Sequence, residues 1–143
     1  MGKGLFISLL SLLVLCSGAA ADMVARRNGT VTDLTTGLTW QQAEAGAMTW
    51  TEAVDYCENL SLANQDDWRL PSCVELQSIV DYSRRDPSIN TAVFPGTMSA
   101  GYWSSTPYTL QSGVAWVVDF VDGDVTYGLK SYRLYVRAVR GEQ

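Results

Sequence analysis

The sequence predicts an α+β fold, with two short helices packed on a small antiparallel sheet. Two observations predict the helices: Thr49 with Glu52, and Ser72 with Glu75, are capping-box pairs, and each pair precedes an apolar stripe with helical spacing. A third observation predicts the sheet. Short segments rich in β-branched and aromatic residues, bounded by turn residues, lie before and after the helical pair.

Residues 1–21 have the features of a secretory signal peptide. A lysine precedes a short apolar run, and small alanines supply a cleavage site after Ala21. The run is too short to cross a bilayer, so we expect no membrane span. Attachment as a lipoprotein through Cys16 is the alternative, but a bulky leucine stands just before that cysteine. We therefore expect an exported protein, periplasmic or extracellular, whose mature form is residues 22–143.

Composition limits the classes of function. The mature chain of 122 residues fits one domain, and its nine basic and fifteen acidic residues give a net charge of −6. This balance does not favour nucleic acid as a partner. The sequence contains no histidine, which excludes Ser-His-Asp and Cys-His catalysis and histidine-ligated zinc. Because no other catalytic set stands out, we expect a protein that is not an enzyme.

The first half of the mature chain predicts a hairpin and then the two helices. Residues 30–32 and 38–40 are β-branched or aromatic segments around a polar turn. The first helix is expected at residues 50–60. The second begins at Cys73 and carries its apolar stripe to Val80.

The second half predicts a long irregular segment and then strands. Residues 86–101 are rich in Ser, Asn, Gly and Pro, and long ordered loops often carry function. Asp122 and Gly123 favour a tight type I′ turn between two of the strands that follow. The expected strands are residues 102–106, 115–121, 125–129 and 134–139.

The mature chain contains two cysteines, Cys57 and Cys73. In an exported protein two cysteines suggest one disulfide, which here would tie the helix pair together and contribute about 3 kcal/mol. The alternative is two buried reduced thiols, since sequence does not show whether the two Cβ atoms approach each other.

Candidate ligand-contacting residues lie next to the long irregular segment. Trp103, with Tyr102, Ser105 and Tyr108 nearby, could offer an aromatic surface to a ligand. The remaining tryptophans occur within strand and helix patterns, where a large ring fills a small core. They are Trp40, Trp50, Trp68 and Trp116.

Calcium is the one cofactor for which the sequence offers candidate ligands. Asp119, Asp122 and Asp124 cluster around the predicted turn and could supply carboxylate oxygens. Turn chemistry explains them equally well. Arg69 is expected to hydrogen-bond loop carbonyls, and Glu75 is accounted for by its capping box.

Five motifs run through the mature chain in a fixed order. They are Asp33-Leu34-Thr35-Thr36-Gly37-Leu38-Thr39-Trp40, Thr49-Trp50-Thr51-Glu52-Ala53, Asp67-Trp68-Arg69-Leu70-Pro71, Tyr102-Trp103-Ser104-Ser105-Thr106 and Tyr135-Val136-Arg137. This series resembles the bacterial Lcl C-terminal domain family, named after a collagen-like adhesin. The resemblance implies a C-type-lectin-like fold and a non-catalytic, adhesin-like module that recognises a glycan or a surface protein.

The chain departs from the family pattern in two respects. Family members often carry a cysteine at the position of Ala138, which would be the natural partner of Cys57, and here Cys73 could substitute for it. The adhesin that names the family resembles a binder of sulfated glycosaminoglycans, and the acidic balance of this chain does not favour that ligand.

Two other classes of protein are weighed against the binding module. One is a structural or protein-interaction subunit of a cell-envelope assembly, which would self-associate as a homo-oligomer or bind one protein partner. The other is an enzyme related to the formylglycine-generating enzymes. Those enzymes use a reactive cysteine pair near the C-terminus, and no cysteine follows Cys73 here.

Overall fold

The computed structural model describes residues 22–142, so the expected signal peptide and Cys16 lie outside the described residues. These residues form two helices and nine strands. In chain order they are β1 (Met23–Ala25), β2 (Thr30–Asp33), β3 (Thr39–Gln41), β4 (Ala47–Met48), α1 (Trp50–Glu58), α2 (Cys73–Gln77), β5 (Gly101–Pro107), β6 (Val114–Asp119), β7 (Val125–Leu129), β8 (Leu134–Tyr135) and β9 (Val139–Arg140). Within the same part of the chain, neither helix has the length and apolar character needed to cross a membrane.

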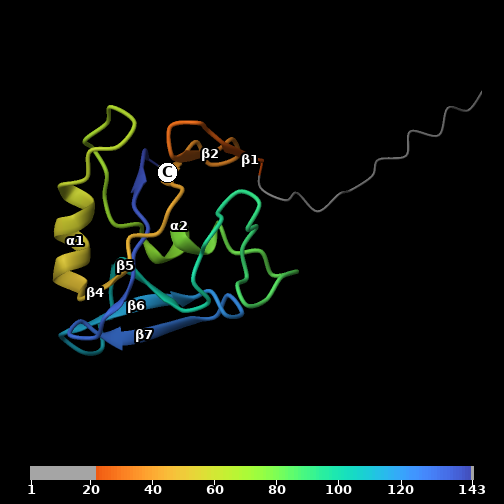
Figure 1. Cartoon of the computed structure of the whole chain (residues 1–143). Helices are drawn as coiled ribbons and strands as arrows, with labels where there is room; N and C mark the ends of the chain where they lie inside the picture. Colours follow the sequence, from red (N-terminus) through yellow and green to blue (C-terminus); the bar gives the residue numbers. More distant parts are fainter. Residues whose placement is uncertain (1–21, 143) are drawn as a thin grey trace, which may run out of the picture.

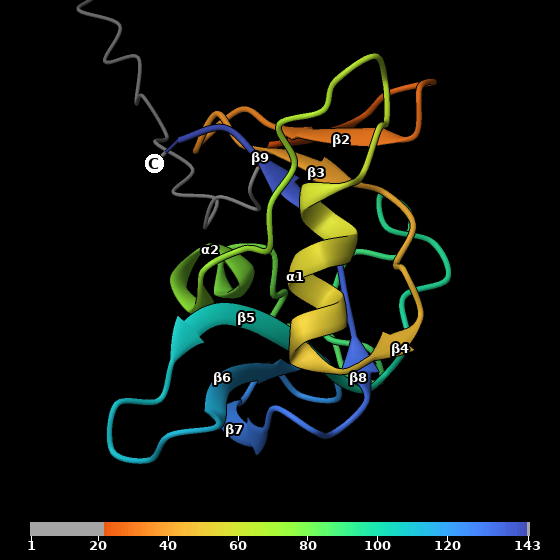
Figure 2. The same ribbon diagram turned by 90° about the vertical axis from the view of Figure 1, so that its left-hand side faces the viewer.

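The strands form two sheets, with the orders β1-β2-β3-β9 and β4-β8-β5-β6-β7. Figures 1 and 2 show the sheets at opposite ends of the molecule, with α2 between them and α1 along one side. The predicted α+β class is confirmed, but the predicted single antiparallel sheet is wrong. The segment expected as one last strand divides into β8 and β9, which join different sheets, and β8 runs parallel to β5.

Both helices begin where the capping boxes predict. The Thr49 hydroxyl accepts from the Glu52 backbone N–H and the Ser72 hydroxyl accepts from that of Glu75, and each glutamate side chain accepts in return. α2 ends before the predicted Val80, because the chain continues in tighter turns with three-residue hydrogen bonds.

The connection between β6 and β7 is longer than the predicted two-residue turn. Asp119 N donates to Asp124 O at 2.8 Å, which closes a loop of residues 120–123. Phe120 is buried in this loop and Gly123 has a φ of +89°, which glycine adopts without strain. The predicted strand therefore ends two residues early, where Phe120 leaves the ladder to enter the core.

The core consists of two clusters of buried side chains. One surrounds α2 and includes Trp40, Phe94 and Tyr102, and the other lies against α1 and includes Trp68 and Trp103. Among the four tryptophans expected in the core, Trp40 and Trp68 are buried, whereas Trp50 and Trp116 are half-buried.

Two arginines fix the C-terminal segment to the rest of the fold. Arg69 donates to both carboxylate oxygens of Glu75 at 2.6 Å and to Gly141 O at 2.7 Å. It was expected to bond carbonyls of its own loop, and its side-chain partners are instead a carboxylate and a C-terminal carbonyl. Arg137 is buried and donates to the carbonyls of Gln41 and Gln42.

Candidate functional site

Tyr102 and Trp103, two of the predicted ligand-contacting residues, are fully buried. Trp103 Nε1 donates to Met48 O at 2.9 Å, the Tyr102 hydroxyl accepts from Met98 N at 3.0 Å, and burial raises the pKa of Tyr102 to about 12. The expectation that their rings face a ligand is wrong, because β5 is an inner strand covered on both faces. Ser105 is exposed.

The fourth predicted residue, Tyr108, belongs to a group of aromatic side chains at the surface. Its ring stacks on that of Tyr127 with centroids 4.7 Å apart and an angle of 18°, and it meets the Trp116 ring edge-on at 5.0 Å. We call Tyr108, Trp116 and Tyr127 the aromatic surface. Tyr127 is 55% exposed, so much of its side chain is open to solvent.

Strand register places these rings together. Trp116 in β6 pairs directly with Tyr127 in β7, and directly paired residues of neighbouring antiparallel strands point to the same side of a sheet. Tyr108 reaches them because its N–H donates to Val114 O at 3.1 Å, which folds the β5–β6 loop back over the strands. Three segments that are separate in sequence thus form one surface.

Apolar side chains extend the aromatic surface at its rim. Leu129 and Tyr132 are exposed and, with Tyr127, line a shallow hollow of about 110 Å³. Leu110, in the loop after Tyr108, is 84% exposed. An exposed apolar group of this kind, rimmed by polar residues, is typical of an interaction site.

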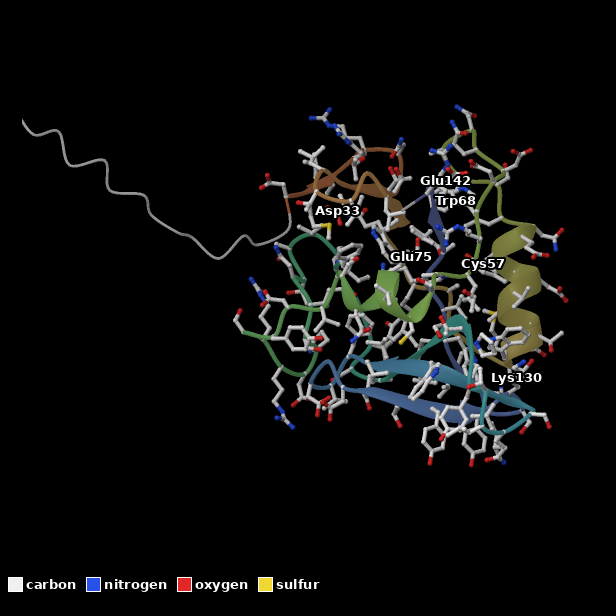
Figure 3. The ribbon with its side chains drawn as sticks, turned by 180° about the vertical axis from the view of Figure 1, so that it is seen from behind. Asp33, Cys57, Trp68, Glu75, Lys130 and Glu142 are labelled. Carbon is white, nitrogen blue, oxygen red and sulfur yellow. The ribbon has the colours of Figure 1, made fainter. Side chains whose placement is uncertain are left out.

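The hollow that adjoins the aromatic surface is lined by no Lys, Arg, Asp or Glu side chain. The neighbouring lysine, Lys130, lies at the end of β7 (Figure 3), and its Nζ stands 3.8 Å above the Trp50 ring in a cation–π contact. Its charge is therefore directed toward α1. The surface suits an uncharged ligand.

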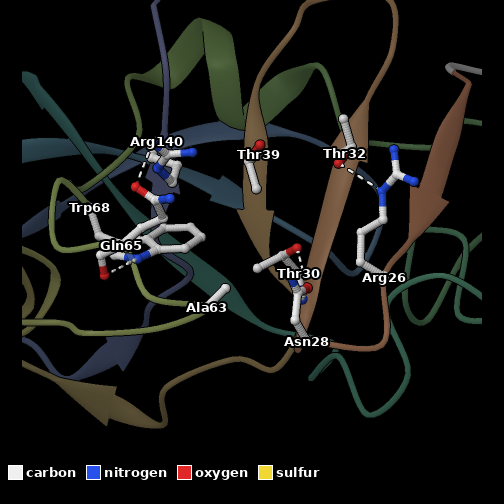
Figure 4. A pocket seen from close by; sticks show the side chains of 9 residues that line it. All are labelled: Arg26, Asn28, Thr30, Thr32, Thr39, Ala63, Gln65, Trp68 and Arg140. Atoms are coloured by element: carbon white, nitrogen blue, oxygen red, sulfur yellow. Dashed lines mark hydrogen bonds between the residues drawn. The ribbon is translucent and has the colours of Figure 1, made fainter.

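A second concavity lies over the sheet β1-β2-β3-β9 (Figure 4). It has a volume of about 240 Å³ and is polar. Its lining residues are Arg26, Asn28, Thr30, Thr32, Thr39, Ala63, Gln65, Trp68 and Arg140.

The two arginines that line this hollow are already hydrogen-bonded to neighbouring side chains. Arg26 Nε donates to Thr32 Oγ1 at 3.2 Å, and Arg140 donates to Asp67 Oδ1 at 2.6 Å and to Gln65 Oε1 at 3.1 Å. The hydrogen bond from Arg140 lowers the pKa of Asp67. Trp68 is buried at the base, so the hollow presents no open aromatic face, and we regard it as the weaker candidate site.

Two of the three aspartates considered as calcium ligands accept turn hydrogen bonds through their carboxylates, and Asp124 takes part in the turn through its backbone. Asp119 Oδ1 accepts from Val121 N at 2.8 Å, and Asp122 Oδ1 accepts from Asp124 N at 3.0 Å. Across residues 22–142, no three His, Cys, Asp or Glu side chains are grouped to hold a metal ion. Turn chemistry accounts for these aspartates.

Cys57 and Cys73 are both free thiols, so the predicted disulfide is not formed in the structure. The physical reason is their placement, because Cys57 points into the cluster beside α1 and Cys73 into the cluster around α2. Burial, with a smaller effect of the Glu58 charge, raises the pKa of Cys57 to about 12, and burial also raises that of Cys73. Ala138 lies in the same cluster as Cys57.

Sequence reasoning missed Trp116, Tyr127 and Tyr132 as surface residues. Residues 114–118 are apolar throughout and give no signal that Trp116 reaches the surface, and locating its neighbour required the strand register.

Comparison with known proteins identifies the family. No curated protein matches the chain at a significant level. The sequence profile of the Lcl C-terminal domain matches residues 29–140, which span every element from β2 to β9. The match covers well over half of the chain, which therefore belongs to the Lcl C-terminal domain family.

Proposed function

We propose that the chain is an exported, non-catalytic, adhesin-like module that binds an uncharged glycan on its aromatic surface. The observation that carries the proposal is the stack of half-buried Tyr108 on exposed Tyr127, with half-buried Trp116 set edge-on beside it. Sugar rings carry C–H groups on one face and pack that face against aromatic rings, and the tyrosine hydroxyls can hydrogen-bond the sugar hydroxyls at the rim.

The charge distribution and the family support this choice of ligand. No cationic side chain lines the hollow beside the aromatic surface, and Lys130 points over Trp50 on the other face of the sheet, which favours a neutral sugar over a sulfated one. Membership of a family named after an adhesin domain is consistent with a binding role. The features of residues 1–21 lead us to place this binding outside the cytoplasm.

The position of the surface also suits an adhesive module. β1 and β9, which lie near the two ends of the described chain, belong to the sheet at the opposite end of the molecule from β7 (Figures 1 and 2). A ligand bound at β6 and β7 is therefore remote from both ends.

Binding of residues 22–143 to a glycan array, with calcium and then with a chelator, tests the proposal. We expect selective binding of neutral glycans that persists in chelator. Tyr127→Ala should weaken it about tenfold, the equivalent of 1.4 kcal/mol for one lost stacking ring. Tyr127→Phe keeps the ring and should retain most of the affinity. Tyr82→Ala, the same change at an exposed tyrosine outside the aromatic surface, is the matched control.

Three results would contradict the proposal. Binding that Tyr127→Ala leaves unchanged would show that the aromatic surface is not the site. Loss of binding in chelator would move the site to the aspartates near the β6–β7 loop. A complete absence of glycan binding would refute the ligand class.

The exposed Leu110 supports a second candidate, an envelope subunit that binds a protein through the same surface. Purification of one stoichiometric protein partner whose binding is lost in Leu110→Asp, together with a blank glycan array, would favour this candidate over the first.

A further inference from the structure

The outer edge of β7 has free backbone hydrogen-bonding groups. β7 is the last strand of its sheet and pairs with β6 alone. Lys130 N donates to Gly113 O and Asp119 N donates to Asp124 O, both at 2.8 Å. The backbone N–H and C=O groups of the even-numbered residues are therefore directed toward β6. In an antiparallel ladder the intervening residues direct their N–H and C=O groups the other way, so Val125 and Tyr127 direct theirs outward. The N–H of Leu129 also points outward, whereas its C=O accepts from Tyr132 N at 2.8 Å.

The features that usually protect a sheet edge are absent from β7. The strand reads Val-Thr-Tyr-Gly-Leu, with no proline and no charged side chain, and its register with β6 has no bulge. Four of its five residues are exposed. An edge of this kind is a template for another strand.

We propose that β7 pairs antiparallel with β7 of a second copy of this chain, with the two-fold axis at Tyr127. In this register Tyr127 faces its own counterpart and Val125 faces Leu129 of the other copy. The outward N–H and C=O groups of these residues match in phase, and the Val125 N–H of each copy would share Leu129 O of the other with the Tyr132 N–H that it already accepts. A shift of one residue would bring inward-directed groups to the interface and would lose these bonds.

Charge complementarity supports a second copy as the occupant. Centring the pair on Tyr127 places Asp124 of each copy directly opposite Lys130 of the other, because both residues lie three positions from the centre. Both belong to the even-numbered set, which points to the face where Lys130 lies over Trp50. Two opposite-charge pairs would therefore close the ends of the interface, and the exposed apolar side chains of Val125, Tyr127 and Leu129 would meet on the other face.

The proposed dimer goes beyond glycan binding and does not depend on it. The paired sheet would bring two aromatic surfaces edge to edge through Tyr127, and two linked surfaces bind a repeating ligand with greater avidity than one. The interface is short, so we expect a reversible dimer with a dissociation constant of about 10 to 100 μM, the range of small transient interfaces.

Sedimentation equilibrium of residues 22–143, over protein concentrations from about 1 μM to 1 mM, tests the pairing. Wild type should shift from monomer to dimer across this range. Asp124→Lys alone, and Lys130→Asp alone, each place like charges opposite one another and should weaken dimerisation at least tenfold. An equimolar mixture of the two variants restores both opposite-charge pairs and should dimerise as wild type does.

The mixture guards against variants that fail to fold, because only folded chains can rescue each other. Asp55→Lys makes the same charge change at an exposed site on α1 and should leave dimerisation unchanged. A wild-type chain that stays monomeric to 1 mM would overturn the proposal. So would a dimer that is insensitive to both charge reversals, or a mixture that remains monomeric. None of these measurements uses a glycan, so their failure is distinct from failure of the proposed function.

Discussion

Replacing Arg137 with methionine should destabilise the fold severely, because this side chain joins three segments from the inside. Arg137 is 1% exposed and donates to Gln41 O at 2.9 Å, to Gln42 O, and to Thr97 Oγ1 at 2.8 Å. Its guanidinium carbon stands 4.8 Å from the Phe94 ring centroid. None of its hydrogen-bond partners is a carboxylate, and burial lowers its pKa to about 10.

The expected loss can be worked out from these contacts. Arg137→Met leaves two main-chain carbonyls without a donor, at about 1–3 kcal/mol each. It also removes a cation–π contact of about 1 kcal/mol. Relief of the buried charge offsets part of this, so we expect a net loss of about 3 kcal/mol in the free energy of unfolding. In a domain of this size that corresponds to a fall of roughly 10 °C in Tm.

Urea and thermal unfolding followed by tryptophan fluorescence would measure the effect. Arg137→Lys keeps the charge but not the forked donor geometry, so it should recover only part of the loss. Arg85→Met, at an exposed position, is the control and should change the unfolding free energy by less than about 0.5 kcal/mol. If Arg137→Met behaves like this control, the reasoning that buried carbonyls depend on the guanidinium is refuted.

Three further predictions concern thiols, acid stability and a tight turn. Cys57 and Cys73 should resist a thiol reagent at pH 8 in the native protein. Denaturation without reductant should release two reactive thiols per mature chain. If no thiol reacts after denaturation, the two cysteines form a disulfide after all. Burial would raise the pKa of Glu75, but hydrogen bonds from an arginine and a serine outweigh it and lower the pKa. Stability should therefore be lost as pH falls below the ordinary glutamate pKa, and Glu75→Gln should cost about 1–2 kcal/mol at pH 7 and flatten that dependence in urea titrations. Gly123→Ala would place its Cβ 2.5 Å from a valine methyl group, whereas the Cβ of Gly96→Ala would meet nothing within 4 Å. Both positions have positive φ, so both variants share a backbone strain of about 1–2 kcal/mol. Calorimetry should therefore show a lower Tm for Gly123→Ala than for Gly96→Ala.

The parts of the fold that sequence predicted are those decided by local chemistry. The helix starts at Thr49 and Ser72 were correct because a capping box involves four consecutive residues. The end of α2 was predicted too late, because no local sequence signal indicates that the helix ends at Gln77 and not at Val80.

The candidate site was only partly predictable, because burial in a sheet depends on strand order. Trp103 stands beside a long irregular segment in sequence, which suggested exposure, but its strand is an inner one and the core cluster that includes Ala53 and Trp68 covers its ring. Of the predicted group, Tyr108 alone joins the aromatic surface. Its neighbours there are Trp116 and Tyr127, and only the pairing of β6 with β7 brings these two residues together.

Phe120 explains both the error in register and the origin of the surface. A two-residue turn at Asp122 and Gly123 would pair Trp116 with Leu129. Phe120 instead leaves the ladder and packs edge-on against Tyr102, with ring centroids 5.0 Å apart, which lengthens the loop and shifts the register by two residues.

That shift has two consequences at the surface. Trp116 lies opposite Tyr127, which creates the aromatic surface, and Tyr127 stands midway between Asp124 and Lys130 along the outer strand. The proposed ligand site and the proposed dimer edge therefore both depend on one buried phenylalanine. A change at Phe120 that altered the loop length would disturb both surfaces, although neither contains this residue.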